Sequence, residues 1–179
     1  MAKVGRFAAV QPWLSLVVRL SMAGILFAAA IPKLQDIPQS VRAVRAYQLL
    51  PESVVPFVGT MLPYVEIALG LLLLLGLFTR TASIIWLAMM AAFLTGVIWA
   101  WSTGLSIDCG CFGGGGEVEA GTTNYPSHVL ERLGFIALGT FLAIWPRSRF
   151  SVDGWMSPAP ALQAPEEASV HSTPNDSRK

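Results

Sequence analysis

Residues 54–78 read VVPFVGTMLPYVEIALGLLLLLGLF, and this stretch decides the class of the fold. Glu66 is its one charged residue, and a run of five leucines follows at positions 71–75. A bilayer core of about 30 Å requires roughly 20 mostly apolar residues in a helix. The stretch therefore predicts a helix that crosses a membrane.

Three further apolar blocks flank this stretch, at residues 13–31, 81–101 and 127–146. Arg19 interrupts the first block, which favours a first membrane span over a cleaved signal peptide. The last block reaches spanning length only when it includes Glu131 and Arg132. The blocks lack the alternation typical of barrel strands. We therefore predict an all-α fold, an integral membrane four-helix bundle with helices at about 13–31, 54–78, 81–101 and 127–146.

The composition agrees with a membrane protein and excludes other classes. The chain has 179 residues, of which 54% are hydrophobic and 13% are charged, and its formal net charge is +1. A soluble domain is typically about 25% charged. The balanced charge argues against a nucleic-acid partner, which would require a basic surface. Residues 1–12 are expected to be a cytoplasmic segment, 13–146 the membrane domain, and the proline-rich residues 147–179 a disordered cytoplasmic tail.

The basic residues predict the orientation, because cytoplasmic loops carry an excess of Lys and Arg. With the N-terminus inside, five basic residues near the helix ends lie in the cytoplasm and three lie outside, while residues 102–128 carry none. The inner set is Lys3, Arg6, Arg80, Arg147 and Arg149, and the outer set is Lys33, Arg42 and Arg45. We therefore expect a multi-pass protein of the cell membrane with both termini cytoplasmic. A short amphipathic helix at 38–50, with Val41, Val44 and Tyr47 on one face, is expected outside.

The two cysteines of the chain, Cys109 and Cys111, are separated only by Gly110. The predicted topology places them on the extracytoplasmic side, where disulfides persist. A disulfide across so short a spacing is strained, and strained exposed disulfides are the reactive ones. Redox chemistry is the favoured interpretation. An inert or purely structural loop is one alternative, and a metal site with Asp108 and His128 is the weakest, so no metal is expected.

The ionisable residues in or near the membrane are the other candidates. A charge inside a bilayer is costly and normally finds a partner. We predict that Arg19 and Glu66 form an ion pair between the first two long helices. The alternative makes Glu66 a proton relay or part of a quinone pocket, and the cofactor is otherwise open. Lys33 is interpreted as an anchor at the membrane interface.

The sequence resembles the DoxX-like membrane proteins and, more narrowly, their MauE branch, over about residues 14–146. The DoxX-like pattern comprises Lys33, Tyr-Gln-Leu-Leu-Pro at 47–51, Leu-Pro-Tyr-Val-Glu at 62–66, Gly70 and Gly76. The added Cys-Gly-Cys-Phe-Gly at 109–113 is similar to the MauE group. The resemblance implies a redox-associated membrane protein that assists disulfide formation or maturation of an exported dehydrogenase with a thioredoxin-like partner. Nothing in the sequence points to methylamine itself.

Three functions remain as hypotheses. The first is a membrane thiol–disulfide redox protein with Cys109 and Cys111 as reactive groups, supported by Gly110, Phe112, Gly113, Glu66, Arg19 and Lys33. Arg132, His128 and the helix start at 126–127 are expected to favour the thiolate. The second is a non-catalytic scaffold, and the third is a small transporter. Quinone-linked membrane thiol oxidases use two cysteine pairs, whereas this chain has one, so the electron acceptor, the direction of transfer and the attacking cysteine stay open.

Overall fold

The computed structural model describes residues 2–108 (side chains from residue 10), 110, 114–119, 123–146, 148 and 150–153. In this part of the chain, four helices are long and apolar enough to span a membrane, at Val10–Gln35, Val55–Leu75, Thr79–Ser102 and Tyr125–Ile144. This confirms the prediction of an all-α membrane bundle. The elements in chain order are α1 (Ala2–Gln35), α2 (Ile37–Ala46), α3 (Val55–Leu75), α4 (Thr79–Ser102), β1 (Ile107–Asp108), β2 (Gly116–Glu117) and α5 (Tyr125–Ile144).

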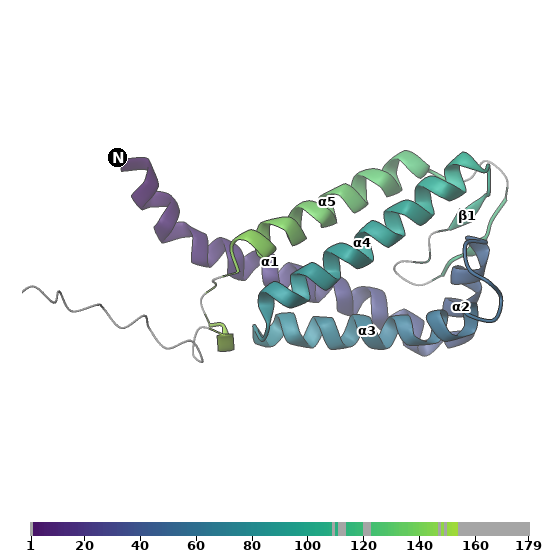
Figure 1. The fold of residues 1–179 in the computed structure, drawn as a ribbon, viewed down its shortest axis with the longest axis horizontal. Coiled ribbons are helices and arrows are strands. Elements are labelled where there is room, and N and C mark those ends of the chain that lie inside the picture. The colour runs from purple at the N-terminus through teal and green to yellow at the C-terminus, as the bar shows by residue number, and fades with distance from the viewer. Residues whose placement is uncertain are drawn as a thin grey trace, which may run out of the picture.

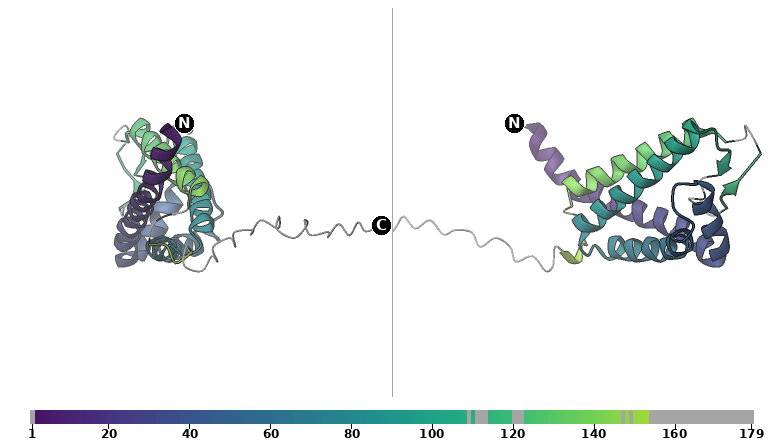
Figure 2. Two further views of the ribbon diagram at one scale, coloured as in Figure 1. Left: turned by 90° about the vertical axis from the view of Figure 1, so that its left-hand side faces the viewer. Right: turned by 45° about the vertical axis from the view of Figure 1, so that its right-hand side comes forward.

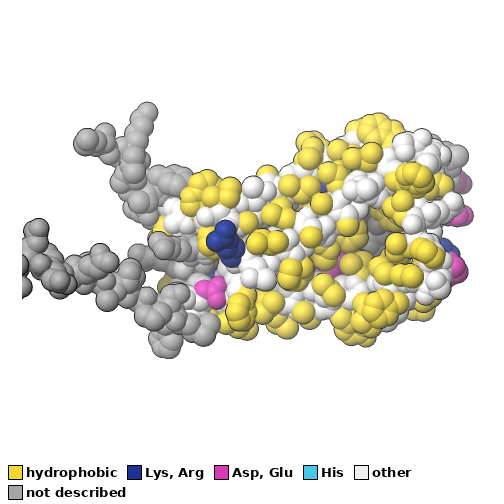
Figure 3. Space-filling model, in the orientation of Figure 1, with side chains coloured by type: hydrophobic (Ala, Val, Ile, Leu, Met, Phe, Trp, Pro, Cys, Tyr) yellow, Lys and Arg dark blue, Asp and Glu magenta, His cyan; other side chains and the backbone are white. Residues whose placement is uncertain are grey.

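The four long helices form two antiparallel pairs, α1 with α3 and α4 with α5 (Figure 1). The pairs diverge toward one end of the bundle, where α2 and the two short strands lie (Figures 1 and 2). We call this the hairpin end. The opposite end carries the start of α4 together with residues 148 and 150–153. Hydrophobic side chains cover much of the visible long side of the bundle, and acidic side chains gather at the hairpin end (Figure 3). This distribution fits a molecule whose sides face lipid.

The centre of the bundle is packed around Trp86 of α4, which is fully buried. Its ring nitrogen donates a hydrogen bond to the backbone oxygen of Phe135, 3.0 Å away on α5. Gly139 permits this approach, since a Cβ there would lie 2.6 Å from the Trp86 ring. Small residues commonly allow such close helix contacts in membranes, where lipid tails remove the hydrophobic drive for helix association.

The short helix α2 starts at a proline-containing turn that Asp36 caps, because its side chain accepts a hydrogen bond from the backbone nitrogen of Gln39. Its buried residues are the small Ser40, Ala43 and Ala46, while Val41, Val44 and Tyr47, which the sequence analysis placed on one face, are half-buried. Val41 lies close to α3 at Gly59, where a Cβ would lie 2.6 Å from the Val41 backbone. The Ser40 hydroxyl donates to the Gly59 carbonyl at 2.7 Å, which fixes α2 to α3.

At the opposite end, Asp153 caps the start of α4. Its carboxylate accepts hydrogen bonds from the backbone nitrogens of Phe78 and Thr79, both at 2.8 Å. A carboxylate is favourable there because the first helical N–H groups lack partners and carry partial positive charge. Residues 150–153, which the sequence analysis assigned to the tail, therefore contact the bundle, while residues 154–179 lie outside the described part.

Candidate functional site

The segment that carries the two cysteines is a β-hairpin and not an open loop. Strands β1 and β2 are antiparallel, with Ile107 opposite Glu117 and Asp108 opposite Gly116. Cys109, Cys111, Phe112 and Gly113 lie outside the described residues. Their neighbours Asp108, Gly110 and Gly114 are described, and these define where the hairpin sits. The hairpin lies at the end of the bundle away from the start of α4 (Figure 1).

Gly110, between the two cysteines, is in a conformation and a contact that only glycine tolerates. Its φ angle is +63°, in the left-handed region. A Cβ at this position would lie 2.7 Å from the Cβ of Ala43 on α2 and 3.2 Å from the backbone of Gly115. Its backbone nitrogen faces the carboxylate of Asp108 at 3.4 Å. The hairpin thus folds back on itself and presses its backbone against α2.

Helix α2 also holds the hairpin by a hydrogen bond. The amide of Gln39 donates a hydrogen bond to the Gly115 carbonyl at 3.0 Å. Between α2 and the bundle lies a cavity of about 20 Å³, which we call the outer cavity. Lys33, Ser40, Tyr47, Phe93 and Gly110 are among its lining residues. One wall of this cavity is therefore the backbone between the cysteines, and another is a lysine side chain.

Lys33 and Glu66 form a buried ion pair. The Nζ of Lys33 lies 2.5 Å from Oε1 of Glu66, and the two side chains are 4% and 2% exposed. The predicted Arg19–Glu66 pair is therefore wrong, and Lys33 is not an anchor at the membrane surface. The lysine also lies 6.0 Å from the centre of the Phe93 ring, at the outer limit of a cation–π contact.

Arg19 is bound at the opposite end of the bundle. Its guanidinium donates to the Ser148 hydroxyl at 2.9 Å and to the Phe150 carbonyl at 3.2 Å, and the side chain is buried. It lies against Gly76, where the absence of a side chain leaves room for the guanidinium. Gly76 follows Glu66 by ten residues, which is about 15 Å along a helix. Arg19 therefore does not reach Glu66.

The second carboxylate oxygen of Glu66 faces the interior of the bundle. Oε2 is buried and has no hydrogen-bond partner among the described residues. Glu66 lines a second cavity of about 20 Å³, the inner cavity, together with Trp86, Phe93, Arg132 and Phe135. This volume holds about one water molecule, whereas pockets for larger organic ligands measure some hundreds of Å³. The cavity beside Glu66 is therefore too small for a quinone ring.

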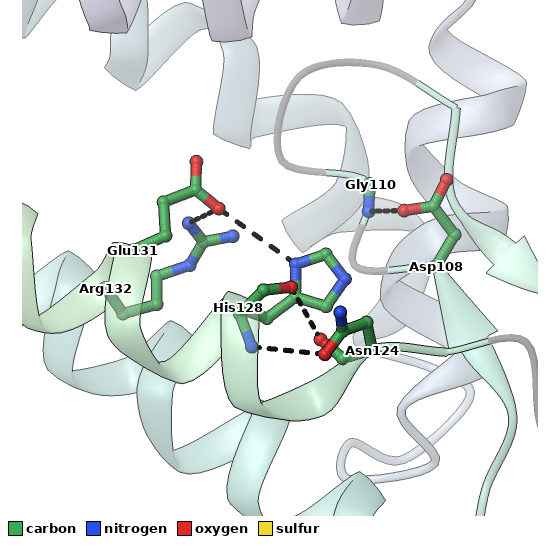
Figure 4. A network of polar contacts seen from close by, with 7 residues as sticks. Asp108, Gly110, Asn124, His128, Glu131 and Arg132 are labelled. Carbon is green, nitrogen blue, oxygen red and sulfur yellow. Dashed lines mark hydrogen bonds and ion pairs between the residues drawn. The ribbon is translucent and has the colours of Figure 1, made fainter.

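The start of α5 brings polar groups to the hairpin end (Figure 4). Asn124 caps the helix, since its side chain accepts a hydrogen bond from the Ser127 nitrogen. Nδ1 of His128 lies 4.0 Å from the Glu131 carboxylate, which also lies 3.2 Å from Arg132. Arg132 is almost fully buried, and it shares the inner cavity with Glu66. The sequence analysis expected Arg132 near the cysteines, which lie outside the described residues, and the structure places Arg132 and Glu66 around one cavity.

Sequence reasoning missed the contacts of Ala43 and Gln39 with the hairpin, and the hydrogen bonds of Arg19 to Ser148 and Phe150. The small-residue spacing of Ser40, Ala43 and Ala46 is the signal that could have identified the packing face of α2. No comparable pattern marks Ser148 or Phe150 as partners of Arg19, because one partner contact is made by a backbone oxygen.

The family model described as methylamine utilisation protein MauE matches residues 11–146, which includes all four candidate spans except the first residue of one. No curated protein matches the chain. No solved structure matches it either.

Proposed function

Because the chain belongs to the MauE family of methylamine utilisation proteins, we propose that it is a membrane thiol–disulfide redox protein. Its four apolar helices fit a multi-pass membrane protein. Cys109 and Cys111 are its reactive groups, and an exported thioredoxin-like protein is its partner. Redox support for the maturation of an exported dehydrogenase subunit is the proposed purpose.

The observation that carries the proposal is the position of Gly110. The residue between the cysteines is held by its left-handed backbone and by Ala43, on a hairpin that α2 supports. A disulfide across one residue removes little freedom from the unfolded chain, so it would contribute little as a structural cross-link. A fixed, tightly bent backbone at the end of a bundle instead suits a dithiol that must meet another protein.

The proposed exchange proceeds in two steps. The thiolate of one loop cysteine attacks a sulfur of the partner's disulfide, a new S–S bond forms, and the released partner sulfur takes up a proton. The second loop cysteine then loses its proton and attacks the mixed disulfide. The loop is left as a disulfide and the partner as a dithiol, so two electrons have moved to the partner. The reverse sequence oxidises the partner and reduces the loop.

The test is to trap the mixed disulfide in the native host. The second thiol is needed to resolve the mixed disulfide. One of the two variants Cys109→Ser and Cys111→Ser, but not both, should therefore accumulate an adduct that reductant releases. Mass spectrometry of the adduct after a non-reducing gel should identify an exported thioredoxin-like protein. The double variant is the control, since it should insert normally and form no adduct.

Two results would count against the proposal. Normal maturation of the client in the double cysteine variant would leave the non-catalytic scaffold as the function. Loss of the whole protein in that variant would instead indicate that the cysteines are structural. The scaffold is the second candidate, because α2 presents exposed charged side chains at the hairpin end, where another protein can dock.

A further inference from the structure

A cavity of about 690 Å³ lies at the opposite end of the bundle, and we call it the end cavity. Three of the long helices line it, through Gln11 of α1, Arg80 and Ile84 of α4, and residues 143–146 at the end of α5 and just beyond it. Pockets for organic ligands measure about 300–1,000 Å³. The end cavity therefore has room for an organic ligand, whereas the inner and outer cavities measure about 20 Å³ each.

The polar groups of the end cavity lie where three candidate spans reach the membrane surface. Gln11 is the second residue of the span Val10–Gln35, and Arg80 is the second residue of Thr79–Ser102. Trp145 directly follows the span Tyr125–Ile144. Tryptophan is enriched at the boundary between lipid and water, and arginine side chains near helix ends extend toward the head groups. The polar side of the end cavity is therefore at the level of the lipid head groups.

The apolar part of the lining continues onto the sides of the bundle. Ile84, one helical turn after Arg80, is 54% exposed, and Ile144 at the end of α5 is 60% exposed. Exposed apolar side chains on a membrane-spanning helix contact the lipid tails, which are equally apolar. The lining thus combines a charged and polar part with an apolar part, as the surface of an amphiphilic ligand does.

Arg80 brings an uncompensated positive charge to the end cavity. Its side chain is exposed, and none of the ion pairs between described residues includes it. Asp153, the acidic residue that caps the same helix, has its two carboxylate oxygens on the backbone nitrogens of Phe78 and Thr79. A guanidinium group matches a phosphate in shape and charge, because its N–H groups form a planar fork. The cation of the end cavity is therefore suited to a phosphate group.

We propose that the end cavity binds an anionic phospholipid, whose phosphate lies on Arg80 and whose acyl chains run along Ile84 and Ile144. Gln11 adds a second polar group, since its side-chain amide is held beside the cavity by a hydrogen bond to the Ser15 hydroxyl at 3.0 Å. Basic pockets between transmembrane helices bind phospholipid head groups in this way. A zwitterionic lipid carries its own cation, so a lipid with net negative charge is the better match for Arg80. The site involves no cysteine and no protein partner, and it is independent of the proposed redox function.

The experiment is native mass spectrometry of the full-length protein in a non-ionic detergent. The protein is titrated with phosphatidylglycerol, and the dissociation constant of the first bound lipid is obtained from the masses of the adducts. Arg80→Gln removes the cation, and its matched control is Arg42→Gln, which removes an exposed cation at the hairpin end. Ile84→Gln makes the apolar wall polar, and its matched control is Ile98→Gln, because Ile98 is 49% exposed on the same helix.

The proposal predicts that Arg80→Gln raises the dissociation constant of the first phosphatidylglycerol by about fivefold, which is the contribution of one basic residue near an anionic membrane surface. Ile84→Gln should also weaken binding, while both control variants should bind as the wild type does. Phosphatidylcholine should bind to the wild type more weakly than phosphatidylglycerol, and Arg80→Gln should reduce this difference. An excess of inorganic phosphate should not displace the lipid, because phosphate makes no contact with the apolar wall.

Equal dissociation constants for the wild type and Arg80→Gln would overturn the proposal, and so would an equal loss of binding in Arg80→Gln and Arg42→Gln. Displacement of the lipid by inorganic phosphate, with Ile84→Gln binding as the wild type does, would indicate a simple anion site and would overturn the assignment to a phospholipid. All four substituted side chains are exposed, so the variants should fold, and circular dichroism verifies this.

Discussion

Breaking the Lys33–Glu66 pair should destabilise the bundle far more than removing both of its members. In Lys33→Met the carboxylate of Glu66, 2% exposed and already with one oxygen lacking a hydrogen bond from the described residues, loses its partner at 2.5 Å. Removing one member of a buried pair costs about 3–5 kcal/mol, and an isolated charge at the centre of a membrane helix about 2.5–3.5 kcal/mol. We expect a loss of about 3 kcal/mol in the free energy of unfolding, or roughly a hundredfold in the unfolding equilibrium.

The double variant Lys33→Met with Glu66→Met should recover most of this loss, since it leaves no buried charge and fills the space with apolar side chains. The assay is unfolding in mixed detergent micelles with increasing denaturing detergent, followed by the helical signal in circular dichroism. The control is Arg19→Met with Glu66→Met, which also removes one cation and one anion. Because Arg19 lies at the opposite end against Ser148 and Phe150, its loss should add to that of Glu66→Met and rescue nothing.

Two outcomes would refute this reasoning. The first is strict additivity of Lys33→Met and Glu66→Met, which would mean that the two side chains do not interact. The second is rescue of Glu66→Met by Arg19→Met, which would restore the pairing that the sequence alone suggested.

Three further predictions concern the hairpin, the helix cap and the orientation. Gly110→Ala should speed amide hydrogen exchange in β1 and β2 more than Gly104→Ala does, because both glycines have left-handed φ angles but only Gly110 of the two faces a close contact. Ala43→Gly should reverse part of the effect of Gly110→Ala, and equal exchange in the two glycine variants would contradict the close packing. Asp153→Ala should lower the free energy of unfolding by about 1–2 kcal/mol, since two backbone donors at the start of α4 lose their acceptor. Glu117→Ala, at an exposed strand position, should have little effect in the same denaturation, and an unchanged free energy for Asp153→Ala would mean that the cap is not formed. A membrane-impermeant maleimide should label reduced Cys109 or Cys111 in intact cells, and labelling only after permeabilisation would reverse the predicted orientation.

The sequence was sufficient to predict the helices because the apolar blocks are long and carry few charges. The expected spans at 54–78 and 81–101 differ from Val55–Leu75 and Thr79–Ser102 by only a few residues. Every backbone polar group within lipid must be paired inside the protein, so a long apolar block is expected to be a helix. Composition alone therefore identifies such spans. The span expected at 127–146 reaches spanning length only when it includes Glu131 and Arg132. The structure has this helix at Tyr125–Ile144, and both residues lie on it.

Pairing of the buried charges could not be predicted in the same way, because it depends on how far one helix is shifted along another. Helix α2 packs on the first half of α3 at Gly59, so α3 begins beyond the end of α1. That offset aligns Glu66 with Lys33, at the end of α1, and leaves Arg19 level with Gly76. Neither the hydropathy of the spans nor the positions of the charges contains this shift.

The hairpin was also beyond sequence reasoning. Six glycines between positions 110 and 121 predict an irregular loop, since each glycine permits many backbone angles. The contacts with Ala43 and Gln39, 60 or more residues earlier in the chain, define its position. Such contacts depend on the tertiary fold, so only the structure reveals that the backbone between the cysteines adjoins the cavity of Lys33.

Trapping the redox state of Cys109 and Cys111 in intact cells tests the central claim most directly. Cells are quenched with acid, free thiols are alkylated, and mass spectrometry measures the fractions of dithiol and disulfide in the hairpin peptide. The proposed function predicts that both states are present and that a brief pulse of membrane-permeable reductant shifts the ratio, which then returns within minutes. A single state that never changes, or a reduced state that is not reoxidised after the pulse, would contradict a thiol–disulfide redox function.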